Sequence, residues 1–194
     1  MILPYQKNWP YIHETAFVAS SADIIGKVKI FSHASIWFQT LIRGDTQSIH
    51  IGEQTNIQDH CVLYGGGQNH PLKIGSGVTV CHHASLQGCE IGNHVFIGVG
   101  SIILDQVKIG NECWIEAGTI LPQGMSIPSQ SLVVGQPGKV VRSLTIEEIN
   151  QLVKFAKNYV KLAEEYYGSV PSPSRNGHGA SDLGWLARAL EEDG

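Results

Sequence analysis

Aliphatic residues recur at every sixth position along most of this chain. The longest unbroken series runs through Ile91, Ile97, Ile103, Ile109, Ile115, Leu121, Ile127 and Val133. The same spacing extends from Ile12 to Ile42 and returns, after two interruptions, at Ile51 and Ile74. A period of six fits neither an amphipathic helix nor the alternation of an ordinary strand. It is typical of a repeat protein built from six-residue units.

The residues between these aliphatic positions indicate how each unit folds. Many units carry a second small or apolar residue four places after the aliphatic one, as at Ala16, Cys61 and Val95, so two side chains per unit point inward. Glycine follows the aliphatic residue in several units, where the chain can turn a corner. We therefore expect an all-β fold over residues 1–143, a parallel β-helix of hexapeptide repeats with three short strands per coil. A β-sandwich is the alternative, but its strands would alternate with a period of two.

The hexad pattern is interrupted at two places in the middle of the chain. One interruption lies between Ile42 and Ile51, and the other is the glycine-rich stretch 64–71. Since a coil can extrude a loop without disturbing its neighbours, we expect loops at both places.

A different period begins near Thr145. Apolar residues then recur at three- and four-residue spacing, which predicts an amphipathic helix over residues 144–168 that packs on the β-helix. Thr145 and Glu148 form its predicted capping box, and Gly168 its end. Residues 169–194 begin as a linker by composition and end in a segment that can form a short terminal helix.

Composition and charge argue against several classes of function. The chain has 194 residues and a net charge of −4, and its 13 Lys and Arg residues are scattered, so we expect no nucleic-acid partner. Neither a membrane-spanning apolar run nor a signal-peptide pattern is evident, so we expect a cytoplasmic protein with no membrane partner. The four cysteines form no CxxC pair, and we expect buried free thiols.

Five short motifs resemble those of a known family. They are Arg43-Gly44-Asp45, Asn56-Ile57-Gln58-Asp59, Val80-Cys81-His82-His83-Ala84, Gly88-Cys89-Glu90-Ile91-Gly92 and Val134-Gly135-Gln136-Pro137-Gly138-Lys139. Their order is similar to that in the gamma-class carbonic anhydrases, over about residues 10–167. The resemblance implies a left-handed β-helix, a homotrimer, and active sites at the subunit interfaces.

The resemblance also implies a metal site. In that family three histidines hold the metal, two from one subunit and one from its neighbour, and the matching positions here are Tyr64, His82 and Gln87. Catalytic zinc needs three protein ligands, whereas a carboxamide oxygen is a weak donor and a phenol must first lose its proton. We therefore expect a degenerate site with His82 as the remaining ligand, at which zinc is conceivable but stable binding is not expected.

Three other histidines are near this site in sequence. His60 and His83 occupy different hexad positions from the lost ligands, so neither replaces one without a change of backbone. His70 follows three glycines whose loop could fold it back. The alternative, which we favour, is that all three are exposed loop or interface histidines.

The remaining family positions are kept. Arg43 and Asp45 resemble an ion pair across the subunit interface, with Asp59 as a buried partner of Arg43. Asn56 and Gln58 resemble the groups that orient zinc-bound water and carbon dioxide, and Tyr159 matches a helix tyrosine that reaches the active site. The simpler interpretation gives the first five residues a role in trimer assembly. The helical period alone makes Tyr159 a core-facing residue.

These residues lead to three hypotheses. The first is a catalytically silent homotrimer that serves as scaffold, subunit or binder of a small molecule at its interfaces. The second is an active zinc-dependent carbonic anhydrase or acyl-CoA thioesterase with an atypical ligand set. The third, and weakest, is a hexapeptide acyltransferase, for which His70 is the only residue that we can nominate. Metal content separates the first two hypotheses, and acetyl-CoA binding tests the third.

Overall fold

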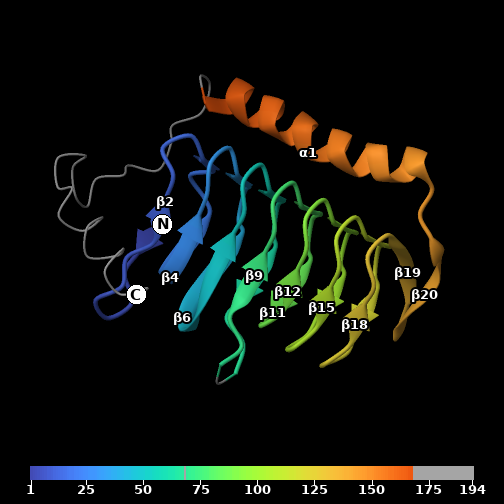
Figure 1. Ribbon diagram of the computed structural model, residues 1–194. Coiled ribbons are helices and arrows are strands. Elements are labelled where there is room, and N and C mark those ends of the chain that lie inside the picture. The colour runs from blue at the N-terminus through green and yellow to red at the C-terminus, as the bar shows by residue number, and fades with distance from the viewer. Residues whose placement is uncertain (68, 168–194) are drawn as a thin grey trace, which may run out of the picture.

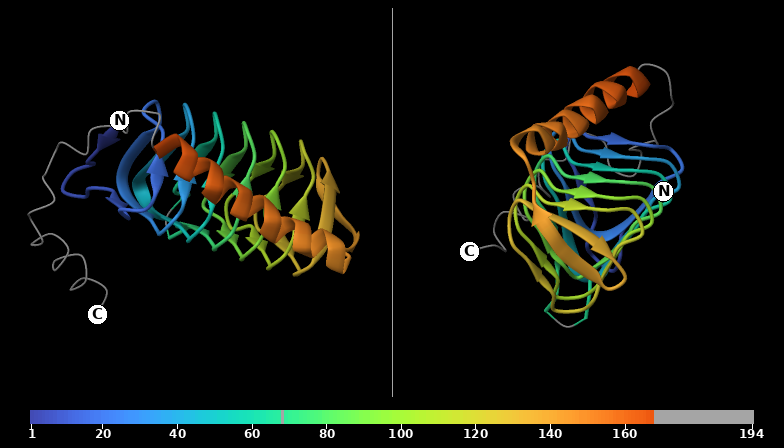
Figure 2. Two further views of the ribbon diagram at one scale, coloured as in Figure 1. Left: turned by 90° about the horizontal axis from the view of Figure 1, so that it is seen from above. Right: turned by 90° about the vertical axis from the view of Figure 1, so that its right-hand side faces the viewer.

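The computed structural model describes residues 1–67 and 69–167, and they form an elongated prism of short strands with one helix along its side (Figure 1). Strands of successive coils pair in parallel, in register, along each face of the prism. Figure 2 shows the coils stacked behind one another around a three-sided interior. The predicted parallel β-helix with a C-terminal helix is therefore confirmed.

The prism has three faces, which we name by the side chains that they carry outward or by what covers them. The helix face consists of β3 (Phe17–Val18), β5 (Ser35–Ile36), β7 (Asn56–Ile57), β10 (Thr79–Val80), β13 (Phe96–Ile97), β16 (Trp114–Ile115), β19 (Ser131–Gly135) and β20 (Gly138–Ser143). The apolar face consists of β1 (Ile2–Leu3), β8 (Val62–Tyr64), β11 (Ser85–Gln87), β14 (Ile102–Ile103) and β17 (Ile120–Leu121). The charged face consists of β2 (Tyr11–Ile12), β9 (Leu72–Ile74), β12 (Glu90–Ile91), β15 (Lys108–Ile109) and β18 (Ser126–Ile127).

Two longer strands continue from the apolar face onto the charged face. They are β4 (Asp23–Ile30) and β6 (Leu41–Ile51), and each pairs with strands of both faces. The expected loop at the first interruption is wrong, because β6 runs through it as one strand and the extra residues are absorbed by a shift in its register with β4 between Gly26 and Val28. The second interruption is a loop between β8 and β9, as predicted.

The interior of the prism is an aliphatic ladder made by the hexad positions. Ile24, Ile42, Leu63, Leu86, Ile103 and Leu121 line it from the apolar face, and all six are fully buried. Corresponding residues from the other two faces complete one continuous cluster. Burying each such side chain stabilises the fold by roughly 1.5–3 kcal/mol, so the six-residue pattern alone accounts for most of the core.

Helix α1 (Ile146–Tyr167) lies along the helix face (Figures 1 and 2). The predicted capping box is confirmed, because the Glu148 amide donates to Thr145 Oγ1 at 3.3 Å and the Thr145 amide donates to Glu148 Oε2 at 2.9 Å. Arg142 donates two hydrogen bonds to the Glu148 carboxylate, which lower the pKa of Glu148 to about 2. At the other end, the Tyr167 hydroxyl donates to the Ala16 carbonyl at 2.7 Å.

The prediction that α1 ends at Gly168 and the predictions for residues 169–194 lie outside the described residues. All four cysteines are buried free thiols, as expected. No helix among the described residues is long and apolar enough to cross a membrane.

Candidate functional site

Two of the three expected metal positions come together at one edge of the apolar face. Tyr64 ends β8 and Gln87 ends β11, and these two residues are directly paired in register. Arg43, on β6, pairs with Tyr64 from the other side. The three outward side chains border a hollow of about 280 Å³ that Leu41, Val62, Leu63, Ser85 and Leu86 also line. The coil repeat therefore groups residues that are 21 to 44 positions apart in sequence.

Arg43 makes two contacts within this group. Its Nε lies 3.1 Å from Asp45 Oδ2 on the same strand. Its guanidinium carbon lies 4.6 Å from the centre of the Tyr64 ring, which is the geometry of a cation–π contact. A guanidinium that is paired with Asp45 thus lies against the side chain that occupies one expected ligand position.

Gln87 is held by a carboxylate that the motifs did not identify. Gln87 Nε2 donates to Asp105 Oδ2 at 2.8 Å, and Asp105 Oδ1 accepts a long hydrogen bond from the Gly67 amide at 3.4 Å. Asp105 follows Gln87 by 18 residues, which is the length of one uninterrupted coil. Counting coils along the sequence, rather than searching for motifs, would have placed Asp105 beside Gln87.

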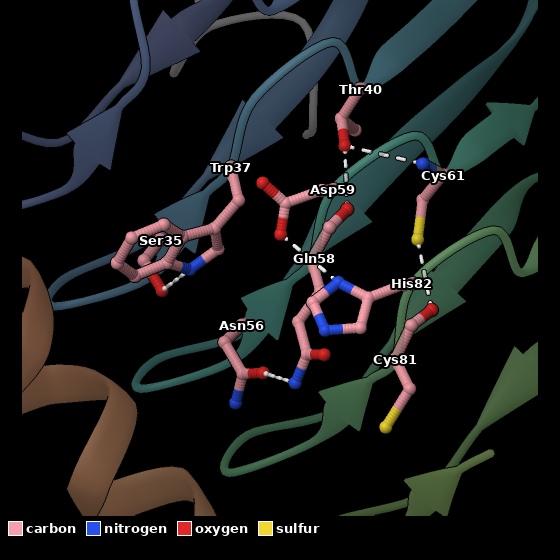
Figure 3. Close-up of polar contacts among 9 residues, drawn as sticks. All are labelled: Ser35, Trp37, Thr40, Asn56, Gln58, Asp59, Cys61, Cys81 and His82. Carbon is pink, nitrogen blue, oxygen red and sulfur yellow. Dashed lines mark hydrogen bonds and ion pairs between the residues drawn. The ribbon is translucent and has the colours of Figure 1, made fainter. Parts of the chain in front are cut away.

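His82, the remaining ligand candidate, lies at a different edge of the prism. It belongs to the turn between β10 and β11, whereas Gln87 is at the far end of β11. His82 Nδ1 lies 3.0 Å from Asp59 Oδ2, in the corresponding turn of the preceding coil (Figure 3). Within one chain the structure therefore brings Tyr64 and Gln87 together, and it keeps His82 apart from them.

Asp59 meets His82 and not Arg43. The Asp59 side chain is 31% exposed in the single chain, so it is not a buried partner of Arg43 within this chain. The reason is the coil geometry, since Arg43 and Asp59 lie near opposite edges of the apolar face. The contact that the family resemblance implies could form only between subunits.

Asn56 and Gln58 form a buried polar ladder beside His82 (Figure 3). Gln58 Nε2 donates to Asn56 Oδ1 at 3.2 Å, and Asn56 Nδ2 donates to Thr79 Oγ1 at 2.9 Å. The Thr40 hydroxyl donates to the Gln58 carbonyl at 2.7 Å. Because a buried amide is costly unless it is hydrogen-bonded, this ladder explains both residues structurally without a ligand.

Tyr159 reaches the same region from α1. Its ring packs edge-on against Trp37 with centroids 5.4 Å apart, and the Trp37 indole donates to Ser35 Oγ at 3.0 Å. Burial raises the pKa of Tyr159 to about 12, with smaller contributions from Cys81 and Asp59. Burial likewise raises the pKa of the Cys81 thiol to about 12. Both groups are therefore neutral in the metal-free chain at pH 7.

The other histidines do not join Tyr64 and Gln87. His60 and His83 stack on each other on the outside of the turn, with ring centroids 4.9 Å apart and planes 2° apart. His70 lines a separate hollow of about 420 Å³, together with Glu90 and Lys108. Across residues 1–67 and 69–167, no three His, Cys, Asp or Glu side chains are grouped so that they could hold a metal ion.

The side chains of this hollow do not fit a zinc ion. Gln87 uses its amide nitrogen on Asp105, which leaves only a weak amide oxygen donor, and Tyr64 lies under a guanidinium. A catalytic zinc site needs three nitrogen, sulfur or carboxylate ligands. The two positions instead belong to a network of hydrogen bonds and a cation–π contact.

The sequence of this chain is similar to those of several known carbonic anhydrases. A carbonic anhydrase of Geobacillus kaustophilus is 42% identical over 166 residues, which cover 86% of this chain and 91% of the relative. Gamma carbonic anhydrase 2, a mitochondrial protein of Arabidopsis thaliana, is 38% identical over 160 residues, or 80% of this chain. This chain therefore spans less than two thirds of the Arabidopsis relatives it matches, covering 58% of gamma carbonic anhydrase 2 and 62% of gamma carbonic anhydrase 1.

Solved structures agree with these relatives on the fold. A crystal structure of a Bacillus cereus protein, proposed to be an acetyltransferase, is 39% identical and superposes with a TM-score of 0.84 over 87% of this chain and 97% of the other. No protein-family model matches the chain. With 42% identity over nearly the whole length of the Geobacillus carbonic anhydrase, and with the hexad solenoid and its motifs in place, the chain belongs to the gamma-class carbonic anhydrase family.

Proposed function

We propose that this protein is a catalytically silent, gamma-carbonic-anhydrase-like homotrimer with a degenerate metal site. It would serve as a scaffold, as a subunit of a larger assembly, or as a binder of a small molecule at its subunit interfaces. The observation that carries the proposal is the state of Tyr64 and Gln87. Both side chains are engaged by neighbours within the chain, and neither is a zinc ligand of ordinary strength.

Trimer formation is supported by the apolar face. One outward column of this face begins with Asp23 and is then mostly aliphatic from coil to coil: Leu41, Val62, Ser85, Ile102 and Ile120. No described element of the chain covers them, and Val62 and Ile102 are 44% and 37% exposed. If each of three prisms buries this face against its two neighbours, the three copies form a closed ring. In that ring His82 and Asp59 of one copy would meet Arg43, Tyr64 and Gln87 of the next.

The test is a gain of metal binding. The wild type should hold substoichiometric zinc after purification in its presence and show little carbon dioxide hydration. The double variant Tyr64→His, Gln87→His should approach one zinc per subunit and gain measurable activity, because two imidazoles would join His82 of the neighbouring copy. Each single variant should do much less, since its ligand shell is still incomplete.

Two outcomes would contradict parts of this proposal. One tightly bound metal per subunit in the wild type would refute the degenerate site and favour an active carbonic anhydrase or acyl-CoA thioesterase. A trimeric double variant that stays free of metal would show that Tyr64 and Gln87 do not face His82 of a neighbour.

An acyltransferase is a second candidate, because the Bacillus cereus relative is proposed to be an acetyltransferase. His70 and the larger hollow that it shares with Lys108 would then be the site. Titration with acetyl-CoA tests this, and His70→Ala should abolish any binding or transfer. Absence of binding at millimolar acetyl-CoA would eliminate this candidate.

A further inference from the structure

We infer that Asp105 is a positioning residue, which fixes the Gln87 side chain in the hollow and holds the glycine-rich loop beside it. This inference rests on the proposed function, because it takes Tyr64 and Gln87 as the site. It adds a residue that lies outside the hollow and outside every motif of the sequence. Its evidence comes from three coils of the prism.

The first observation concerns the orientation of Gln87. An ionised carboxylate can only accept hydrogen bonds, so the 2.8 Å contact with Asp105 Oδ2 requires Gln87 to direct Nε2 toward Asp105. Gln87 Oε1 is then turned away from Asp105, and it has no hydrogen-bond partner among the described residues. Gln87 therefore presents an acceptor to the hollow that Tyr64 and Arg43 border. Asp105 thereby determines that a ligand should bring a hydrogen-bond donor to this position.

The second observation concerns the backbone around Asp105. Its Oδ1 accepts from the Gly67 amide and packs directly against the Cα atoms of Gly66 and Gly88, so that a Cβ at either glycine would overlap this oxygen. Gly88 also has a φ of +46°, a conformation that other residues rarely adopt. The carboxylate thus occupies space that only two glycines leave open, one in the loop and one directly after Gln87. The two glycines also approach each other, since a Cβ at either would come within 2.8 Å of the other's Cα, so the close backbone contact leaves the space that the carboxylate fills.

The third observation links Asp105 to the next coil. The Gly124 amide donates to the Asp105 carbonyl at 2.9 Å, and the Gln106 amide donates to the Gly88 carbonyl at 2.8 Å. The backbone of Asp105 is therefore anchored on both sides by regular coil contacts. Because the carboxylate held there can only accept hydrogen bonds, its position decides which way the Gln87 amide faces.

The chain offers a matched control for this contact. At another edge of the prism, Gln130 Nε2 donates to Glu112 Oε2 at 2.7 Å, again across 18 residues. This pair repeats the chemistry of Gln87 and Asp105 but lies outside both hollows. Removing the carboxylate from each pair in turn separates the effect of position from the general effect of losing such a bond.

The first experiment keeps Tyr64 and Gln87 unchanged and needs no ligand. We expect Asp105→Ala to speed exchange of the Gln87 side-chain amide protons and of the Gly67 amide by about tenfold, the effect of losing one net hydrogen bond. Nuclear magnetic resonance measures both, and Glu112→Ala should change neither. Unchanged exchange at Gln87 and Gly67, or equal acceleration throughout the prism, would overturn the inference.

The second experiment uses zinc as the probe of orientation. In the Tyr64→His, Gln87→His background, the carboxylate of Asp105 should accept a hydrogen bond from the introduced imidazole. We expect Asp105→Ala to weaken zinc binding by about 10- to 100-fold and Glu112→Ala to leave it unchanged. Equal zinc affinity with and without Asp105 would show that this residue does not orient position 87.

The two experiments fail separately. If the double variant binds no zinc at all, Tyr64 and Gln87 do not face His82 of a neighbouring copy, whereas the exchange measurement still decides whether Asp105 orients Gln87. If zinc binds but the exchange rates do not respond to Asp105→Ala, the proposed site stands and the role of Asp105 is refuted.

Discussion

The apolar and charged faces share one interior but differ in the outward column that each carries. On the charged face the outward column begins with Tyr11 and is then polar or charged throughout: Lys29, His50, Lys73, Glu90, Lys108 and Ser126. On the apolar face the equivalent column is largely aliphatic. Since the inward residues of both faces are the same kind of hexad aliphatic, the fold does not require this difference. The outward residues therefore reflect the surroundings of each face and are not needed to specify the fold.

The helix face shows how an apolar outer column is satisfied within the chain. There α1 covers outward aromatics such as Phe17, Phe96 and Trp114, and its own Ala163 and Tyr166 pack onto this face. The apolar face has similar chemistry but no such cover among the described elements. Exposed apolar patches of this kind mark interaction surfaces. This contrast, more than any single contact, favours assembly through the apolar face.

The largest expected effect is on assembly. Ile102→Glu should convert a trimer to monomers at micromolar concentration, because an unpaired carboxylate in an apolar interface costs several kcal/mol, and each 1.4 kcal/mol is about tenfold in affinity. Lys108→Glu, on the charged face, is the control and should remain trimeric. Light scattering coupled to gel filtration measures both masses. A trimeric Ile102→Glu variant would show that the apolar face is not the interface.

The next effect separates two neighbouring isoleucines. Ile103 is fully buried whereas Ile102 is 37% exposed, although both belong to β14. In the monomeric Ile102→Glu background, Ile103→Ala should lower the free energy of unfolding by about 2–5 kcal/mol, because it leaves a cavity in the ladder. Replacing Glu by Ala at position 102 should change it by no more than about 0.5 kcal/mol. Denaturation by urea, followed by circular dichroism, measures both.

A smaller effect is expected at Arg43. Its removal should weaken assembly by about 1.5–3 kcal/mol, the range for hydrogen bonds to charged groups, because Asp45 would lose its partner at the proposed interface. Arg43 is half-exposed in the single chain, so its effect depends on burial by a second copy. Lys108→Ala should change assembly by about 0.5 kcal/mol or less. Equal dissociation constants for the two variants, from sedimentation equilibrium, would remove Arg43 from the interface.

The sequence predicts the fold well because the fold depends on one repeated feature, the six-residue spacing of aliphatic residues. Every hexad aliphatic tested by the structure points inward, and the change of period at Thr145 locates α1. The pairing of Tyr64 with Gln87, and the separation of His82 from both, likewise follow from where each residue falls in its hexad. Because each coil stacks on the one before, the spacing of residues along the chain determines which residues lie side by side.

The site is predicted less completely because its contacts join coils at single positions. Asp105 belongs to no motif, yet it holds Gln87 and packs against Gly66 and Gly88. The cation–π contact of Arg43 with Tyr64 depends on how two side chains turn at the same column, which the hexad period does not specify. His70 comes after the hexad pattern breaks at Tyr64, so no repeat fixes where it lies.

The smallest predicted effect tests the cover of the helix face. Thr145→Ala removes the hydroxyl that accepts from the Glu148 amide at 3.3 Å, and the loss of such a cap should lower the free energy of unfolding by about 1 kcal/mol. Ser126→Ala, an exposed outward position on the charged face, is the control and should lie within about 0.5 kcal/mol of wild type. Unfolding must be compared at equal protein concentration, since assembly contributes to the stability of an oligomer. Because the Arg142 side chain and α1 itself are retained, the Thr145 variant should keep its mass by light scattering while its stability falls. A variant that instead dissociates would show that α1 contributes to the contact between copies, and the division between a covered helix face and an assembling apolar face would then fail.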